Sequence, residues 1–234
     1  LDQTRGWFYV MTVIGNALFD KTPFENVIVN GLILAEDGKK MSKSLGNFRT
    51  VRELLESYRG EVLRFALLSA QYRSPLNFTV ELLEQAQTTL SNLYSGLREV
   101  ADVEADMNVN LAAEPFYAAL NDDLNTPVAI AELHALAKEL NKAEPAQKPQ
   151  LKGRLLAAAA LLGILQQDPQ EWLHGGASDD MISAGEVETL IGQRQQAKLD
   201  KDYDLADGIR QSLLKRGVVL EDSREGTKWR RTSD

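Results

Sequence analysis

The sequence predicts a mainly α-helical protein with an α/β segment at its N-terminal end, an antiparallel helix bundle, and a small α+β domain at its C-terminal end. From residue 50 to residue 165, apolar residues recur three and four positions apart, which is the spacing of amphipathic helices. Before this region, an apolar run at residues 27–34 precedes a loop rich in lysine and serine, an order typical of α/β folds. After it, residues 186–234 combine two helical patterns with two strand-like runs.

The composition is that of an ordinary globular protein, with 234 residues, 44% hydrophobic residues and 26% charged residues. There is no apolar run long enough to cross a membrane, no signal-like start and no cysteine, so we expect a cytoplasmic protein that does not contact membranes. The formal net charge of −8 disfavours nonspecific binding to nucleic acid, so any RNA contact must come from local basic patches. With only two histidines and no cysteine, a Cys/His zinc site is not supported by this chain.

Two segments make up the expected α/β part. Residues 7–19 are apolar on nearly all sides and predict a buried helix, although their β-branched residues leave a strand open. Residues 27–34 predict a strand of a parallel sheet covered on both faces. Ligands of open parallel sheets bind beyond the carboxyl ends of the strands, so Asp2, Gln3 and the following loop would face one crevice.

Residues 38–47 form the most informative segment, Gly-Lys-Lys-Met-Ser-Lys-Ser-Leu-Gly-Asn. Lys40 and Lys43 are compact charges on long stems, which can follow a polyphosphate as negative charge moves to its leaving group. Hydroxyl groups and backbone amides add donors, and the flanking glycines let the backbone approach closely. The P-loop pattern is absent, so we predict a different, mobile phosphate clamp. A solvated basic turn is the alternative.

The bundle is predicted from capping signals and periodicity. Thr50 and Glu53 form a capping box for a helix that Gly60 closes, and Thr79 caps a long helix after a second short one. Thr126 is the expected N-cap of a later helix, and a final helix covers residues 151–165. Asp122 and Asp123 lie just before the helix that Thr126 is expected to cap. For this pair we favour capping and helix-dipole stabilisation over a metal or acid–base role.

The C-terminal region is predicted in two parts. Residues 167–185 contain a proline, adjacent glycines and an Asp pair, which indicates a linker. Helices at 186–199 and 203–216 then precede strands near 218–220 and 227–230. A unit of this size is only marginally stable alone, so we expect it to lean on neighbours.

Several strings carry a resemblance to known families. The loop resembles the signature loop of class I aminoacyl-tRNA synthetases, and residues 40–234 resemble the C-terminal part of bacterial cysteinyl-tRNA synthetases. The strings that match are Lys-Met-Ser-Lys-Ser-Leu-Gly-Asn-Phe at 40–48, Tyr-Arg-Ser-Pro-Leu-Asn at 72–77, Asn-Asp-Asp-Leu-Asn-Thr-Pro at 121–127 and Gly-Val-Val-Leu-Glu-Asp at 217–222. Residues 1–39 are more similar to the isoleucyl, valyl and leucyl group, through Asp-Gln-Thr-Arg-Gly-Trp-Phe and Asn-Val-Ile-Val-Asn-Gly.

The resemblance implies a domain order and a reaction. Residues 1–60 would be the end of a Rossmann-like catalytic domain, 61–166 a DALR-like, tRNA-binding helix bundle, 167–185 a linker and 186–234 an anticodon-binding domain. ATP, accompanied by Mg²⁺, and an amino acid would give aminoacyl-adenylate and pyrophosphate. The aminoacyl group would then pass to a tRNA, which the resemblance to cysteinyl-tRNA synthetases implies is cysteine tRNA. Lys40 and Lys43 would be catalytic, stabilising the phosphates. The implied ATP and adenylate contacts are Asp2, Gln3, Lys40, Met41, Ser42, Lys43 and Ser44.

The resemblance also implies a set of tRNA contacts. Tyr203, Asp207 and Arg210 lie about one turn apart and share a helix face, where an aromatic ring, a carboxylate and a guanidinium can read unstacked bases. Trp229 either joins that surface or fills the small core. The full set of expected tRNA-binding residues is Arg49, Arg52, Arg73, Lys198, Tyr203, Asp207, Arg210, Trp229 and Arg230.

Two motifs expected of a complete enzyme are absent from this sequence. These are the His-x-Gly-His motif of class I enzymes and the His-His-x-x-Glu stretch that contributes zinc ligands in cysteinyl enzymes. We therefore expect the chain to need a missing N-terminal catalytic half and to be inactive by itself. The alternatives are an isoleucyl-type synthetase fragment and a noncatalytic tRNA-binding module. A cysteine-ligating relative that makes a small thiol is disfavoured, since such relatives generally lack the anticodon domain.

Overall fold

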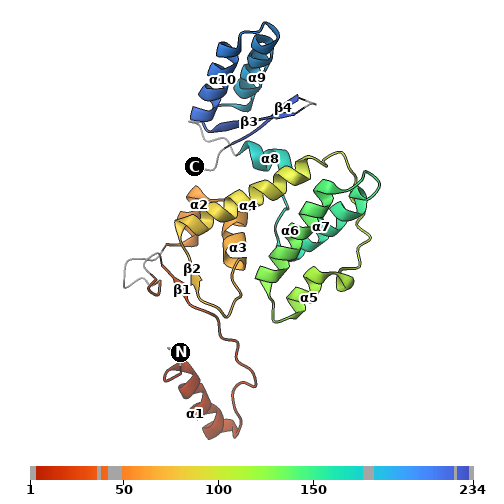
Figure 1. The fold of residues 1–234 in the computed structure, drawn as a ribbon. Coiled ribbons are helices and arrows are strands. Elements are labelled where there is room, and N and C mark those ends of the chain that lie inside the picture. Colours follow the sequence, from red (N-terminus) through yellow and green to blue (C-terminus); the bar gives the residue numbers. More distant parts are fainter. Residues whose placement is uncertain (1–3, 36–37, 42–48, 176–181, 224–225, 232–234) are drawn as a thin grey trace. The chain divides into compact units, whose positions relative to one another are not determined.

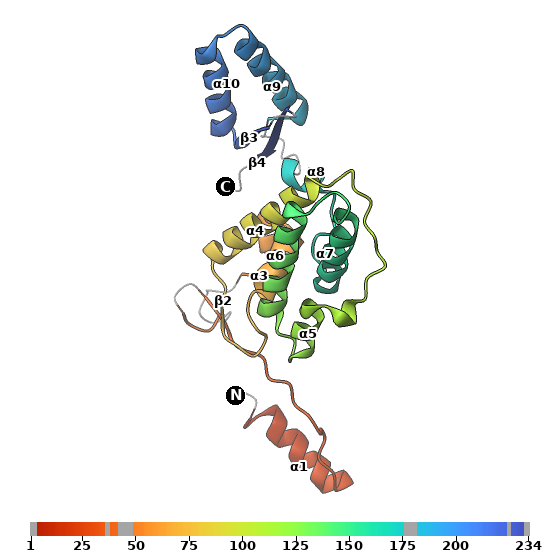
Figure 2. The same ribbon diagram turned by 45° about the vertical axis from the view of Figure 1, so that its right-hand side comes forward.

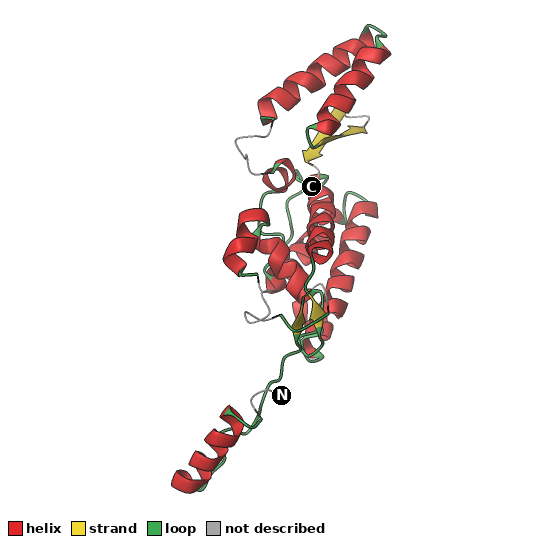
Figure 3. Ribbon diagram, turned by 90° about the vertical axis from the view of Figure 1, so that its left-hand side faces the viewer, coloured by secondary structure: helices red, strands yellow, loops and turns green. Residues whose placement is uncertain are grey.

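The computed structural model describes residues 4–35, 38–41, 49–175, 182–223 and 226–231. These residues are mostly helical, and their strands form two small two-stranded sheets (Figures 1 and 3). The predicted predominance of helix is therefore confirmed. The chain divides into two compact units, residues 1–31 and residues 32–234. None of the helices in the described ranges is both long and apolar enough to cross a membrane.

The first unit is built around α1, Trp7–Phe19, which ends where Asp20 adopts a left-handed conformation. The predicted helix is confirmed, but its predicted burial is wrong for this chain. Within α1 only Gly15 is buried, and most of the large apolar side chains are exposed. Gly15 is required locally, because a Cβ at this position would lie 2.7 Å from the carbonyl oxygen of Lys21.

The predicted parallel strand is much shorter than expected. β1 is Ile33–Leu34 and pairs in parallel with β2, Leu76–Asn77. Residues 27–29 are irregular and exposed, which corrects the predicted run. Strand propensity needs partners and cover to take effect, and in the described residues β2 is the one strand that pairs with β1.

The helix bundle lies in residues 51–174 of the second unit. Its helices are α2 Val51–Ser57, α3 Gly60–Leu68, α4 Val80–Arg98, α5 Pro115–Asn121, α6 Thr126–Lys142, α7 Lys148–Leu162 and α8 Pro169–His174. Helix α4 packs against α3, α6 and α8, and α6 packs against α5 and α7 (Figure 2). One contiguous core of mainly leucine and alanine side chains runs through these contacts. The apolar positions that recur three and four residues apart therefore do face the core, as predicted.

Local capping was predicted well, with two differences. Thr50 and Glu53 form both bonds of a capping box at α2, and Thr79 caps α4. However, Gly60 begins α3 instead of closing α2. The N-cap of α6 is Asn125, whose side chain accepts a hydrogen bond from Val128 N, so the prediction of Thr126 was one residue late. Helix α5 was not predicted.

Helix α8 lies within the stretch that was expected to be a linker. Asp168 caps it, and its residues Trp172 and Leu173 are buried in the bundle core. The Trp172 ring stacks on Tyr94 of α4 with 4.5 Å between ring centroids. The segment is therefore an ordered part of the bundle, which corrects the expectation for residues 169–174.

The C-terminal part of the second unit has the predicted two helices and two strands. It consists of α9 Ala184–Leu199, α10 Tyr203–Lys215, β3 Val218–Ser223 and β4 Gly226–Arg231. The strands form an antiparallel hairpin in which Leu220 lies opposite Trp229. A separate core joins the hairpin to the helices through Ile182, Val187, Ile191, Ile209, Leu213, Val218, Leu220 and Trp229.

Candidate functional site

Helix α10 presents the predicted set of polar side chains to solvent. Its N-cap is Asp202, whose carboxylate accepts a hydrogen bond from Leu205 N at 3.1 Å. The apolar positions Ala206, Ile209 and Leu213 are buried against the small core. The three- and four-residue spacing leaves Tyr203, Asp207 and Arg210 on an outer side, where all three are exposed. The Tyr203 side chain is the most informative, because 63% of this large aromatic residue is accessible.

Asp222 on β3 joins helix α9 to the hairpin beside Lys198. Its carboxylate oxygens each accept a 2.8 Å hydrogen bond from the guanidinium of Arg194, and the hydroxyl of Thr227 donates a further bond at 2.7 Å. Lys198 Nζ lies 3.4 Å from the same carboxylate. Arg194 is 2% exposed, so its charge depends on this pairing, whereas the Asp222 side chain is 40% exposed.

This pairing was missed in the sequence. Arg194 occupies a buried position on α9, in register with Val187, Ile191 and Ala197. A charged residue at an apolar position of a helix was the available signal, since such a residue is buried only when it is paired. It did not identify the partner, which is 28 residues away.

The hydrogen bonds from Arg194 and Thr227 lower the pKa of Asp222 well below its usual range. A carboxylate with a lowered folded-state pKa stabilises the fold above its unfolded pKa of about 3.9, and the contribution is lost as pH falls. We therefore expect wild type to melt higher than Asp222→Asn at neutral pH, and the difference to shrink as pH falls from about 5 to about 2. Thermal melting of both proteins across this range measures the effect. A difference that stays constant with pH would contradict it.

Two of the expected tRNA contacts are engaged within the protein. Trp229 is 2% exposed, and its ring is stacked on His174 while its Nε1 donates to Glu188 at 2.7 Å. The ring thus fills the small core, which corrects its inclusion among surface contacts. Arg230 Nε donates to Glu221 at 3.0 Å, and its side chain is about one-third exposed.

Arg73 is also engaged, in a cluster that joins two of the family-like strings. Its guanidinium donates to Asp123 at 2.7 and 3.2 Å, and the hydroxyl of Tyr72 donates to the same carboxylate at 2.8 Å. These bonds, with that from Arg73 the largest, lower the pKa of Asp123, and the bond to Asp123 raises the pKa of Tyr72. Asp123 therefore joins the loop before β2 to the turn before α6, and the prediction that it caps a helix was wrong.

The remaining two arginines expected to bind tRNA lie at the start of α2. Arg52 is exposed on the first turn of α2, and Arg49 is exposed just before its N-cap. Both lie close in sequence to the lysine loop. Their exposure leaves the prediction of phosphate contact open to test.

The base of the lysine loop is described, whereas most of the loop lies outside the described residues. Lys40 is exposed and forms an antiparallel bridge with Leu34, directly after β1. Met41 N donates to Ile33 O at 3.1 Å, and Gly38 turns the chain with φ of 71°. The positions outside the description include Asp2, Gln3, Ser42, Lys43 and Ser44. The described part of the chain contains no group of three acidic, histidine or cysteine side chains that could hold a metal ion.

Comparisons with known proteins bear on three parts of the chain. Residues 1–79 match the family of class I tRNA synthetases for I, L, M and V, residues 115–166 match the DALR domain, and residues 183–230 match the anticodon binding domain of cysteinyl-tRNA ligase. The cysteine–tRNA ligase of Saccharophagus degradans is 51% identical over 196 residues, which are 83% of this chain and 42% of that protein.

The chain is similar to class I aminoacyl-tRNA synthetases over residues 1–79 and to cysteine–tRNA ligases over most of its length. The ligases of Paramagnetospirillum magneticum and Laribacter hongkongensis are each 48% identical, over 86% and 89% of this chain. These alignments cover 44% and 45% of the relatives, so the chain spans less than half their length. A solved structure of a LeuRS–tRNA–LeuAMS complex from Agrobacterium radiobacter K84 matches 70% of this chain and 26% of that chain at 17% sequence identity. The TM-score of this match is 0.44, which is too low for a comparison of folds.

The two predicted resemblances are both confirmed. The similarity of the N-terminal stretch to the isoleucyl, valyl and leucyl group extends to residue 79, beyond the predicted boundary at residue 39. The similarity to cysteine–tRNA ligases covers most of the chain. The two families therefore overlap in this chain around the lysine loop.

Proposed function

We propose that this chain is the tRNA-binding part of a cysteine–tRNA ligase, in which α10 contacts the anticodon. One observation carries the proposal. Tyr203, Asp207 and Arg210 are exposed together on α10, inside the region that matches an anticodon binding domain. An amphipathic helix of the small core requires none of these three residue types on its outer side.

The three side chains supply complementary ways to recognise an unstacked base. An exposed tyrosine ring offers a face for base stacking, which contributes about 1–3 kcal/mol per base. The carboxylate of Asp207 can accept a hydrogen bond from a base amino group, and the guanidinium of Arg210 can donate two bonds to a guanine edge. Lys198 and Asp222 lie at the neighbouring end of α9 and β3, so we include them in the same surface.

In this proposal the rest of the chain holds the tRNA and contributes to activation of the amino acid. The predicted order of catalytic-domain end, bundle and anticodon domain is kept, with the bundle extended from the expected 61–166 to residues 51–174. Arg49, Arg52 and Arg73 contact backbone phosphates, and Arg73 is also ion-paired with Asp123. Lys40 and Lys43 stabilise the phosphates of ATP, with its Mg²⁺, during adenylate formation, and Asp2 and Gln3 line the adenylate crevice.

Capture of tRNA by the immobilised chain tests the proposal. We expect cysteine tRNA to be retained from a total tRNA pool in clear excess over its share of the pool, as measured by hybridisation to each isoacceptor. Enrichment of isoleucine, valine or leucine tRNA would instead favour the alternative suggested by residues 1–79. Retention of all tRNAs in proportion to the pool, or of none, would contradict the proposal.

A further inference from the structure

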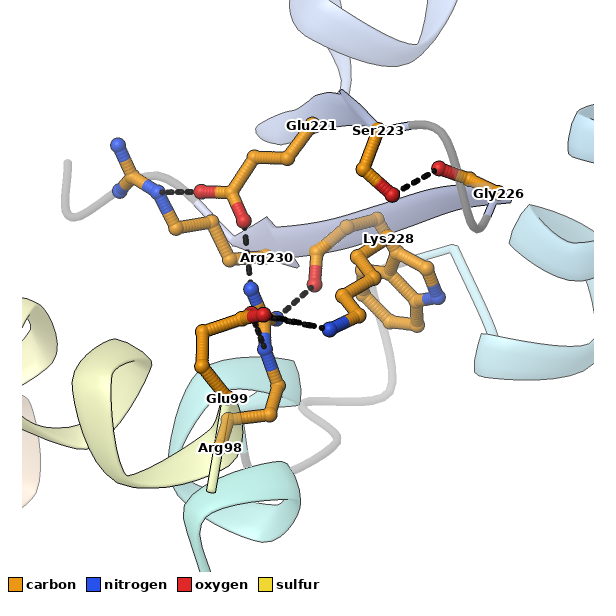
Figure 4. A network of polar contacts seen from close by, with 8 residues as sticks. Arg98, Glu99, Glu221, Ser223, Gly226, Lys228 and Arg230 are labelled. Atoms are coloured by element: carbon orange, nitrogen blue, oxygen red, sulfur yellow. Dashed lines mark hydrogen bonds and ion pairs between the residues drawn. The ribbon is translucent and has the colours of Figure 1, made fainter. Parts of the chain in front are cut away.

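A polar network joins the end of α4 to the C-terminal hairpin (Figure 4). Arg98, in the last turn of α4, donates to Glu221 on β3 at 2.5 Å and to the carbonyl oxygen of Trp229 on β4 at 3.1 Å. Its neighbour Glu99 accepts from Lys228 at 2.9 and 3.0 Å. The other oxygen of Glu221 accepts from Arg230. We call these five residues, Arg98, Glu99, Glu221, Lys228 and Arg230, the Arg98 network.

The hairpin can make these contacts because its two faces differ. Side chains alternate along a strand, so the Trp229 ring enters the small core while Lys228 and Arg230 point to the other face. Glu221 lies directly opposite Lys228 in the strand register and therefore shares that face. One face of the hairpin thus builds the C-terminal core, and the other receives Arg98 from the bundle.

The contact between bundle and hairpin is sensitive to the network because Arg98 is buried. Its side chain is only 3% exposed, and Nε has no hydrogen-bond partner, its nearest carboxylate being Glu99 at 3.8 Å. A buried guanidinium is tolerated when its charge is paired, and removal of one partner leaves the other charge uncompensated. The charge of Arg98 therefore depends on Glu221, which lies on the hairpin and not in the bundle.

Helix α8 makes a second connection between the same two parts. Trp172 packs in the bundle core, and two residues later the His174 ring stacks on Trp229 with 3.9 Å between centroids. Arg231 donates to the carbonyl oxygens of His174 and Ile182, the latter at 2.7 Å. The hairpin is thus held by α8 along one path and by Arg98 along another.

We propose that Arg98 is a positioning residue for tRNA binding, which holds the anticodon surface of α10 at a fixed place relative to the bundle. The inference rests on the proposed function, since it concerns a tRNA that contacts both parts. When two binding surfaces are held rigidly at the right spacing, the second contact forms at high effective concentration. Loosening the Arg98 network lowers that effective concentration without altering either surface. The affinity for whole tRNA then falls, whereas the affinity for an isolated anticodon stem–loop does not.

The test compares two RNAs and two variants that break the network from opposite sides. Glu221→Gln removes the partner on the hairpin, and Arg98→Gln removes the buried charge on α4. For each variant we expect affinity for a whole cysteine tRNA transcript to fall about tenfold, and affinity for its anticodon stem–loop to stay within about twofold. Glu114→Gln serves as the matched control, because it breaks an ion pair of 2.8 Å to Arg154 within the bundle alone.

The outcomes separate this inference from the proposed function. Equal loss of affinity for both RNAs would mean that Glu221 and Arg98 maintain the structure of the anticodon surface itself. This result would overturn the positioning role. Unchanged affinity for whole tRNA in both variants would also overturn it. If wild type binds neither RNA, the proposed function fails, and the inference fails with it. Thermal melting of each variant shows whether a loss of affinity follows unfolding of the C-terminal core.

Discussion

Replacing both Tyr203 and Arg210 with alanine is expected to weaken cysteine tRNA binding about a hundredfold. Stacking of a base on an aromatic ring contributes about 1–3 kcal/mol, and loss of about 1.4 kcal/mol lowers affinity tenfold. A bidentate arginine contact contributes about as much as the stack. Both side chains are exposed, so the double variant should keep its melting temperature. Fluorescence anisotropy with a labelled transcript measures the affinity.

The matched control for this experiment is Lys215→Ala. Lys215 is an exposed cation on the last turn of the same helix, five residues from Arg210 and on another side of α10. Its removal changes net charge as Arg210→Ala does, and we expect affinity to stay within about twofold because one surface charge acts mainly through screened attraction. If the double variant and the control bound tRNA equally well, α10 would not be the contact surface.

The largest effect on stability is expected for Gly153→Ala in α7. A Cβ at this position would lie 1.7 Å from the carbonyl oxygen of Asp106, which is backbone and cannot turn away. Asp106 N also donates to Pro149 O at 2.9 Å, so the loop is tied to the same helix. We expect the free energy of unfolding to fall by about 3 kcal/mol or more, as for severe overpacking. Urea denaturation provides the measurement.

Gly192→Ala in α9 is the control for the same substitution in an open environment. An added Cβ there would have no heavy atom within 4 Å outside its own helix and chain neighbours. Alanine is the better helix former by about 1 kcal/mol, so this variant should be as stable as wild type or more stable. Equal denaturation midpoints for the two variants would show that Asp106 does not approach α7 as described.

Local signals explain which parts of the fold were predictable. Thr50 with Glu53 and Thr79 each cap a helix through neighbours in the sequence, so their patterns identified the helix starts directly. Helix α8 was missed because its proline, glycine and aspartate neighbours are typical of a linker. The burial of Trp172 against Tyr94 is what makes this segment ordered, and that contact spans 78 positions of the chain.

In the candidate site, too, local patterns were predictable and contacts between distant segments were not. The face formed by Tyr203, Asp207 and Arg210 follows from the period of a single helix, so the sequence predicts it. The partners of Arg98, Arg194 and Asp123 lie on other elements and were not predicted. Trp229 shows why composition alone misleads, because an aromatic residue beside two arginines suggests an RNA surface while its ring completes a core.

Dependence of binding on the anticodon tests the central claim most directly. The chain is titrated with a cysteine tRNA transcript and with the same transcript in which only the anticodon bases are replaced. We predict that the replacement lowers the affinity of wild type at least tenfold, and that it has little further effect on the Tyr203→Ala and Arg210→Ala double variant. Equal affinity of wild type for the two transcripts would contradict the assignment of α10 as the anticodon contact.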